Sequence, residues 1–189
     1  MAGLIHVGAW DGREYADHEG PLLLFEPQAE AFAQLLVNLA HKPGVVAVNC
    51  ALGSAPGTAT MYTAKPSHSS SLLRPERHLA LHPDIEFSGH EEVEVDTLDA
   101  VMDARGLRGF DTLVMDVQGF ELEVLRGASR TLQGIDRIRT EVNVEEVYAG
   151  CARIGDLDEV LTDFERVETD LRGPEGAWGD AVYVRRDPP

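Results

Sequence analysis

A chain of 189 residues that is 43% hydrophobic has the length and the apolar content of one globular domain, which we place at 1–189. Its 33 acidic residues outnumber its 16 basic ones, and the resulting net charge of −17 would repel a phosphate backbone, so we expect no nucleic acid partner. No segment approaches the roughly 18 apolar residues of a membrane span, so we expect no membrane partner. Residues 1–10 lack the basic flank of a signal peptide, and the two cysteines lie far apart, so we expect a cytoplasmic protein.

Short apolar runs alternate with helical periodicity in the first part of the chain. Two of these runs stop at polar turns, as buried strands do, and the first of those turns is rich in glycine. Apolar residues then recur at helical spacing until Pro43 and Gly44 break the pattern. The expected elements are strands at 4–9, 21–25, 45–48 and 58–63 and a helix at 29–39.

The periodicity fades between Lys65 and Gly89, where serine, histidine and proline dominate. We expect a loop-rich insertion at about 65–90 that lies over one edge of the sheet, a place where loops often carry substrate contacts. A dense acidic run follows from Glu91 to Asp103. Because that run extends over a strand and a helix, it indicates a solvated surface and not a cation site.

The second half repeats the alternation of strands and helices. Thr97 can cap the first of its helices, whose apolar face is Leu98, Val101 and Met102. The expected elements are strands at 93–95, 111–117, 135–142, from 167 and at 181–184, and helices from 97, at 120–132 and at 157–164. This order predicts an α/β fold with a doubly wound, mainly parallel sheet and helices on both faces. Ligands of such sheets bind beyond the carboxyl ends of the strands.

The ends of the first two strands suggest a nucleotide-like ligand. Gly8 and Gly12 stand in the turn after the first strand, where glycine lets backbone approach a ligand closely. A nicotinamide-binding turn would need a third glycine where Trp10 stands, which disfavours an NAD-dependent oxidoreductase. Glu26 ends the second strand, where an acid can accept hydrogen bonds from both ribose hydroxyls, although it could instead cap the helix after Pro27. Together these residues favour an adenosine-containing cofactor.

A second polar cluster follows the strand at 111–117. Asp116 ends this apolar strand, a costly place for a charge without a partner. Gln118 and Glu121 present an amide and a carboxylate near the same rim, as substrate contacts would. Glu121 also suits a structural interpretation, because an acid in the first turn of a helix is favoured by the helix dipole.

The chain resembles the FkbM-type methyltransferases over nearly its whole length, because it carries in their order IHVGAWDG, LLLFEPQAEAF, NCALGS, SSSLL, VDTLD, LVMDVQGFELEVLRGA, TEVNVEEVY and WGDAVYV. The resemblance implies a class I, Rossmann-like methyltransferase domain that uses S-adenosylmethionine. It also implies methyl transfer to oxygen, on a hydroxyl of a sugar or another natural product. The partner would be a small-molecule or glycan hydroxyl acceptor, and a homo-oligomer stays open.

The resemblance also assigns residues to the cofactor and the acceptor. The cofactor set is Gly8, Ala9 and Gly12 in the loop, Glu26 with Pro27 at the ribose, Ala51 and Leu52 at the adenine, and Asp116 facing the methionine end or the acceptor. His6 stands where the commoner family pattern has an acid, and a branch of the family is similar in having histidine there. A neutral imidazole can accept a hydrogen bond from the cofactor's ammonium, but a core histidine without a ligand is the alternative. The resemblance gives Ser70 and Ser71 contacts to the acceptor or to the cofactor.

Two acids qualify as the catalytic base. Asp116 and Glu141 end consecutive strands of the expected sheet, with Asn143 close by, and either could take the proton of an acceptor hydroxyl. These three residues could instead hold a divalent cation, which we do not favour, so we expect no metal site. The histidines of the insertion, His68, His78 and His82, are the next bases to test. A rival of another class is a cofactor-binding module of a biosynthetic cluster that has no turnover.

Overall fold

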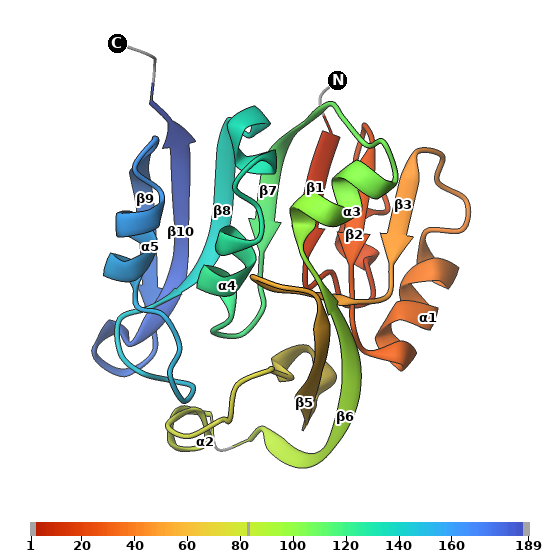
Figure 1. Ribbon diagram of the computed structural model, residues 1–189. Helices are drawn as coiled ribbons and strands as arrows, with labels where there is room; N and C mark the ends of the chain where they lie inside the picture. The colour runs from red at the N-terminus through yellow and green to blue at the C-terminus, as the bar shows by residue number, and fades with distance from the viewer. Residues whose placement is uncertain (1–2, 83, 187–189) are drawn as a thin grey trace.

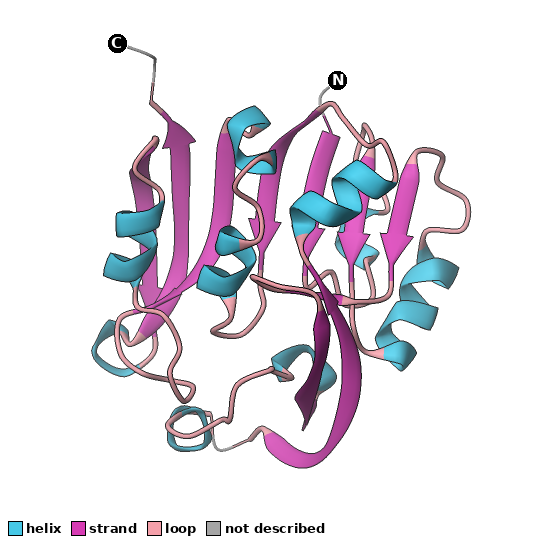
Figure 2. Ribbon diagram, viewed as in Figure 1, coloured by secondary structure: helices cyan, strands magenta, loops and turns pink. Residues whose placement is uncertain are grey.

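The computed structural model describes residues 3–82 and 84–186, and a seven-stranded sheet with the order β3-β2-β1-β7-β8-β10-β9 forms its centre (Figures 1 and 2). The first five strands of this order pair in parallel, whereas β10 runs antiparallel between β8 and β9. The sheet is therefore mainly parallel, as expected. Its strands are β1 (Gly3–Val7), β2 (Leu22–Phe25), β3 (Val45–Val48), β7 (Phe110–Met115), β8 (Arg137–Asn143), β9 (Phe164–Arg172) and β10 (Trp178–Arg185).

Helices pack on both faces of the sheet because β2 is apolar on both sides. Leu22 and Leu24 join one core cluster with α1 (Ala29–Asn38) and the 3₁₀ turn η1 (Arg13–Tyr15). Leu23 and Phe25 point the other way and join a second cluster with α3 (Leu98–Ala104), α4 (Glu121–Arg126) and α5 (Ile154–Val160). Burying each such side chain fully contributes about 1.5–3 kcal/mol. In the described part of the chain, no helix is both long and apolar enough to cross a membrane.

The segment between β3 and α3 forms a second sheet that contains the strands expected at 58–63 and 93–95, while the described residues between 66 and 85 are mostly loop. This sheet has the order β4-β6-β5, and its strands are β4 (Ala51–Leu52), β5 (Gly57–Lys65) and β6 (Glu86–Asp96). The 3₁₀ turn η2 (Ser67–Ser69) and the short helix α2 (His78–Leu81) join β5 to β6. Figure 1 shows this unit below the carboxyl ends of the parallel strands, at the edge where a ligand is expected.

Two expected helices have other bounds. The helix expected at 120–132 is α4 followed by the 3₁₀ turn η3 (Thr131–Gly134), with Gly127 at the end of α4. A Cβ on Gly127 would lie 2.0 Å from the carbonyl oxygen of Gly53, so a glycine is needed at this crossing. The helix expected at 157–164 is α5, which begins earlier, and Phe164 already starts β9. A last 3₁₀ turn, η4 (Pro174–Gly176), joins β9 to β10.

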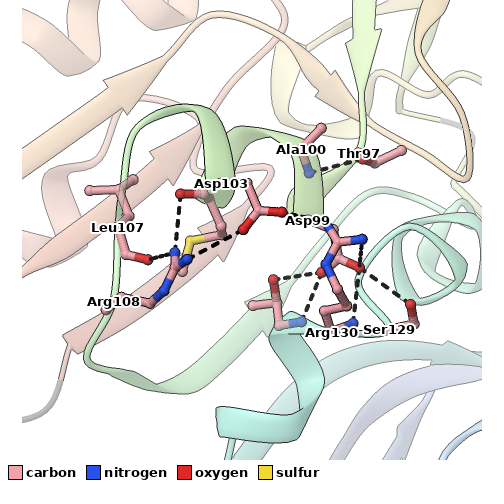
Figure 3. A network of polar contacts seen from close by, with 10 residues as sticks. Thr97, Asp99, Ala100, Asp103, Leu107, Arg108, Ser129 and Arg130 are labelled. Carbon is pink, nitrogen blue, oxygen red and sulfur yellow. Dashed lines mark hydrogen bonds and ion pairs between the residues drawn. The ribbon is translucent and has the colours of Figure 1, made fainter.

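The acidic run does not lie in solvent throughout, because Asp99 is buried and fixes α3 to the start of η3 (Figure 3). Its Oδ2 accepts a hydrogen bond from the backbone N–H of Arg130 at 2.9 Å and its Oδ1 accepts one from that of Thr131 at 2.8 Å. The hydroxyls of Ser129 and Thr131 donate to the same carboxylate. Thr97 caps α3 as expected, since its Oγ1 accepts the N–H of Ala100 at 3.1 Å.

Candidate active site

The glycine turn after β1 lies where three strand ends meet. Gly8 and Gly12 have φ angles of 87° and 66°, in the left-handed region that glycine adopts at low cost. The N–H groups of Gly8 and Ala9 both donate to the carbonyl of Phe25, at 3.0 and 2.9 Å. A Cβ on Gly8 would lie 2.0 Å from the carbonyl oxygen of Asp116, so only glycine fits between β1 and β7. The turn therefore places backbone without side chains at the carboxyl ends of the strands, where a ligand can approach it closely.

Glu26 is buried at the end of β2, and two backbone groups hold its carboxylate. The N–H of Trp10 donates to Oε2 at 2.9 Å, and that of Gln28 donates to Oε1 at 2.8 Å. Burial raises the pKa of Glu26 to about 7, although these hydrogen bonds oppose the rise. The N-cap of α1 is Gln28, so Glu26 does not serve as the helix cap. Oε1 also accepts the side-chain amide of Gln28 at 3.5 Å, while Oε2 keeps a lone pair for a ligand.

A cavity of about 340 Å³ opens between this turn, Glu26 and the second sheet. The whole set of expected cofactor residues lines it, namely His6, Gly8, Ala9, Gly12, Glu26, Pro27, Ala51, Leu52 and Asp116. Met61 of β5 and Phe120, just before α4, add to its apolar side. S-adenosylmethionine fits this donor set, because it combines a ribose diol for an acid, an apolar-faced adenine and a polar methionine end.

His6 lies buried at one side of this cavity. Its Nδ1 is 2.8 Å from the hydroxyl oxygen of Tyr15, while its Nε2 has no hydrogen-bond partner within the described chain. Burial lowers the pKa of His6 to about 3, which keeps the ring neutral near pH 7. A neutral ring can offer Nε2 to a ligand as a hydrogen-bond acceptor if the proton resides on Nδ1.

A second cavity of about 250 Å³ adjoins the first, and Asp116 and His68 line both. Polar side chains from three strand ends line it, namely Asp116, Gln118, Glu141, Asn143 and Asp180. Aromatic rings from the insertion, from the loop after β8 and from β10 line it as well, namely His78, His82, Tyr148 and Trp178. The two expected catalytic acids therefore share one cavity, and one of them borders the cofactor cavity.

Gln118 links the two acids through its side-chain amide. Its Nε2 donates to Oδ1 of Asp116 at 2.7 Å and to Oε2 of Glu141 at 3.0 Å, while its Oε1 accepts from the Tyr148 hydroxyl at 2.5 Å. Burial raises the pKa of Asp116. Burial, together with the negative charge of Asp116, raises the pKa of Glu141 well above its usual range.

Two expected substrate contacts lie apart from both cavities. The carboxylate of Glu121 accepts the backbone N–H groups of Val117 and Gly119, each at 3.2 Å, which matches its structural interpretation. Ser71 donates its hydroxyl to the carbonyl of Gln118 at 2.7 Å. Ser70 lines the cofactor cavity, where it donates to Oε1 of Gln28 at 3.0 Å.

Several cavity residues escape sequence reasoning. Trp178 and Asp180 face Asn143 and Glu141 only because β10 pairs antiparallel with β8, and nothing local in the sequence encodes that register. The indole of Trp10 donates to the Ser67 hydroxyl at 3.0 Å and so connects the glycine turn to the insertion. The positive φ of 45° at Trp10 follows from the tight turn. No group of three or more His, Cys, Asp or Glu side chains is arranged for a metal ion among the described residues.

Comparisons of the sequence with known proteins identify a family and a curated relative. The model of the methyltransferase FkbM domain family matches residues 6–168. The 2-O-methyltransferase NoeI of Sinorhizobium fredii is 35% identical over 108 residues, which are 57% of this chain but only 44% of NoeI. This chain therefore matches less than half the length of that curated relative.

Two solved structures share the fold. The fibrillarin/Nop5p complex aligns with a TM-score of 0.56 at 13% identity, over 98% of this chain and 73% of that one. Magnesium protoporphyrin IX methyltransferase of Synechocystis PCC 6803, solved with S-adenosylmethionine bound, aligns with a TM-score of 0.54 at 10% identity, over 98% and 70%. The fold is that of the class I methyltransferases.

Proposed function

Since the chain belongs to the FkbM methyltransferase family, we propose that it transfers the methyl group of S-adenosylmethionine to a hydroxyl oxygen of a sugar or another natural product. The observation that supports this reaction is the meeting of two cavities at Asp116. One cavity offers what an adenosine cofactor needs, and the other offers polar side chains for an acceptor. A methyl group can pass between two such sites in one step.

The first cavity would hold the cofactor by the residues that line it. The carboxylate of Glu26 would accept the ribose hydroxyls, and Ala51 and Leu52 would pack against the adenine. The neutral ring of His6 would accept a hydrogen bond at the methionine end. Bound there, S-adenosylmethionine supplies a methyl group that its sulfonium sulfur already activates, so the protein need only align the acceptor and remove its proton.

We assign the base to Asp116 and a supporting role to Glu141. Asp116 borders both cavities, whereas Glu141 lines only the second one. Burial and the negative charge of Asp116 raise the pKa of Glu141 well above its usual range, which disfavours a second ionised acid beside Asp116. As the acceptor oxygen forms its bond to the methyl carbon, its proton passes to Asp116, and the amide of Gln118 holds that carboxylate in place. Glu141 would orient the acceptor.

Calorimetry tests the cofactor assignment. S-adenosylmethionine should bind to the purified chain, and Glu26→Ala should weaken binding by about 1–3 kcal/mol, because buried hydroxyls lose a charged acceptor. Glu30→Ala, on the exposed side of α1, is the matched control and should bind normally. Binding of NAD in place of S-adenosylmethionine would indicate the oxidoreductase instead.

Methyl transfer to a panel of sugar and natural-product hydroxyls tests the reaction. Mass spectrometry should find one added methyl group on oxygen, together with S-adenosylhomocysteine. A chain that binds the cofactor but methylates no member of the panel would fit the binding module without turnover, and the proposed function would fail.

A further inference from the structure

Two acids face each other across β8 and β10 in the second cavity. Glu141 and Asp180 are directly opposed in the antiparallel register, and both line the cavity. Opposed side chains of neighbouring strands lie about 4.5–5.5 Å apart at Cβ, and like charges there destabilise the sheet. Arg172 also lines the cavity, where it pairs with Asp180 at 2.5 Å and lies 5.7 Å from the centre of the Trp178 ring. It does not bond to Glu141, so three carboxyl groups, those of Asp116, Glu141 and Asp180, line the cavity against one guanidinium group. Burial and the neighbouring acids favour a proton on Glu141, and a cationic ligand would take the place of that proton.

The wall of the cavity suits an organic cation that carries a ring. His78 stacks on His82 with ring centroids 4.6 Å apart, and His82 lies 5.4 Å from Trp178. His78 also lies 5.0 Å from the ring of Tyr148. Aromatic faces attract cations and pack against the C–H faces of sugar rings.

Three buried polar atoms of residues that line the cavity indicate a ligand with hydroxyl groups. Nδ2 of Asn143, Nδ1 of His78 and Nε1 of Trp178 have no hydrogen-bond partner among the residues that the structure describes. Asn143 and His78 are only 2% and 3% exposed. A buried polar atom without a partner costs about 1–3 kcal/mol, which ligand hydroxyls at these positions would recover.

A metal ion is a poorer occupant than an ammonium group. The Nε2 of Gln118 lies between Asp116 and Glu141, so a hydrogen-bond donor already takes the place where a cation would bridge these carboxylates. An amide nitrogen is no ligand for magnesium or calcium. A positive charge can instead approach Glu141 from the side of Asp180, which faces it across the two strands.

We propose that the second cavity binds an acceptor with a protonated amine beside its hydroxyls, such as an amino sugar, and that the ammonium group lies between Glu141 and Asp180. This inference rests on the proposed function for the identity of the cavity as the acceptor site. It adds that the acids of the cavity select acceptors that carry a positive charge. Asp116 then remains free for the hydroxyl nearest the cofactor.

Three matched sugars test the proposal by binding alone. Glucosamine, N-acetylglucosamine and glucose share the ring and differ at one position, where only glucosamine carries a positive charge. Ligand-observed NMR with the full chain and S-adenosylhomocysteine should show glucosamine binding about tenfold more tightly than the neutral sugars, a difference of about 1.4 kcal/mol. Equal binding of all three, a preference for a neutral sugar, or no binding of glucosamine at millimolar concentration would overturn the proposal.

Charge variants locate the ammonium group. Asp180→Asn should abolish the preference for glucosamine, while Asp170→Asn, which removes the other partner of Arg172, should keep it. Thermal unfolding shows whether each variant is folded, and the comparison of the three sugars on the unaltered chain decides the question if Asp180→Asn is not.

Failure of this inference differs from failure of the proposed function. Methyl transfer to neutral sugars, without any preference for glucosamine, would overturn the proposed amine site but support the proposed O-methyltransferase activity. Methylation of the glucosamine nitrogen, seen by fragmentation in the mass spectrometer, would keep the cationic site but overturn transfer to oxygen.

Discussion

Hydrogen bonds and burial shift the pKa of Glu26 in opposite directions. The hydrogen bonds from Trp10 and Gln28 favour the carboxylate, and burial favours the neutral acid. Burial prevails and raises the pKa to about 7. The side chain that we assign to the ribose therefore titrates in the physiological range, while His6, with its pKa lowered to about 3, does not.

Binding of S-adenosylmethionine should consequently strengthen as the pH rises through 7. The ribose hydroxyls donate to an ionised carboxylate, so below its pKa the free protein must first release a proton, at a cost of up to about tenfold in affinity per pH unit. Calorimetry from about pH 5.5 to 7.5 should show this slope, and Glu26→Gln should abolish it. An unchanged slope in Glu26→Gln, or its loss in His6→Asn, would assign the titration to another group.

Asp116 and Glu141 should differ in their effect on turnover. Asp116→Asn removes the proposed base and should cost about 10²- to 10⁴-fold in turnover at nearly normal cofactor affinity. Glu141→Gln keeps a hydrogen-bonding group at a position that does not line the cofactor cavity, so its loss should be smaller. Near-normal turnover in Asp116→Asn would leave His68, His78 and His82 as bases to test. Loss of activity with a chelator, restored by magnesium, would indicate a metal in place of the base.

At the scale of elements, the buried strands and β5 were predictable, whereas only the end of β6 was, and the pairing of these strands into a second sheet was not. The apolar runs that became β1, β2 and β7 each end at a polar residue, and these ends locate most of the cofactor cavity. By contrast, β6 reads EFSGHEEVEVD, and its acidic, partly exposed residues give little apolar signal before Val93. The wall that Trp178 and Asp180 add depends on long-range pairing.

Local hydrogen bonds explain the other differences in the site. Sequence position puts Glu121 and Gln118 at the rim, and the family resemblance gives Ser71 a contact to the acceptor or the cofactor. Only the structure shows that Glu121 instead accepts nearby backbone N–H groups and that Ser71 donates to a carbonyl. Polar side chains near a strand end can serve the turn as readily as a ligand, because both offer unpaired donors and acceptors.

The attachment of α3 should depend on Asp99. Burial raises the pKa of this acid, but hydrogen bonds from Arg130 and Thr131 outweigh burial and lower it. Asp99→Asn places an amide N–H against a backbone N–H, so it should lower the free energy of unfolding by about 1–3 kcal/mol. Asp103→Asn, which removes exposed ion pairs with Arg108 and Arg130, should cost less than about 1 kcal/mol. Urea unfolding measures both, and equal small losses would show that the buried contacts do not hold α3.

At the scale of the whole molecule, negative charge is both abundant and partly buried. The net charge of −17 repels itself over the surface, and screening by salt weakens that repulsion. Buried acids also make the stability of the fold depend on pH, since burial raises the pKa of Glu26 and of Glu121 to about 7 and that of Glu141 well above its usual range. Salt screens the contribution of these buried acids much less.

Stability should therefore fall as the pH rises from about 6.5 to 8. The unfolded chain has lost its carboxyl protons by then, because an exposed glutamic acid has a pKa of about 4.3, whereas the folded chain still holds protons on these buried acids. Each such proton lowers the free energy of unfolding by up to about 1.4 kcal/mol per pH unit until the folded group has ionised. Histidines with lowered pKa values act below this window, where their unfolded forms take up protons. Urea unfolding in roughly 0.5 M salt, which screens surface charge, should retain the fall, and Glu121→Gln should reduce its slope. Stability that rises over this window, or a slope that salt removes entirely, would show that the buried acids are ionised throughout.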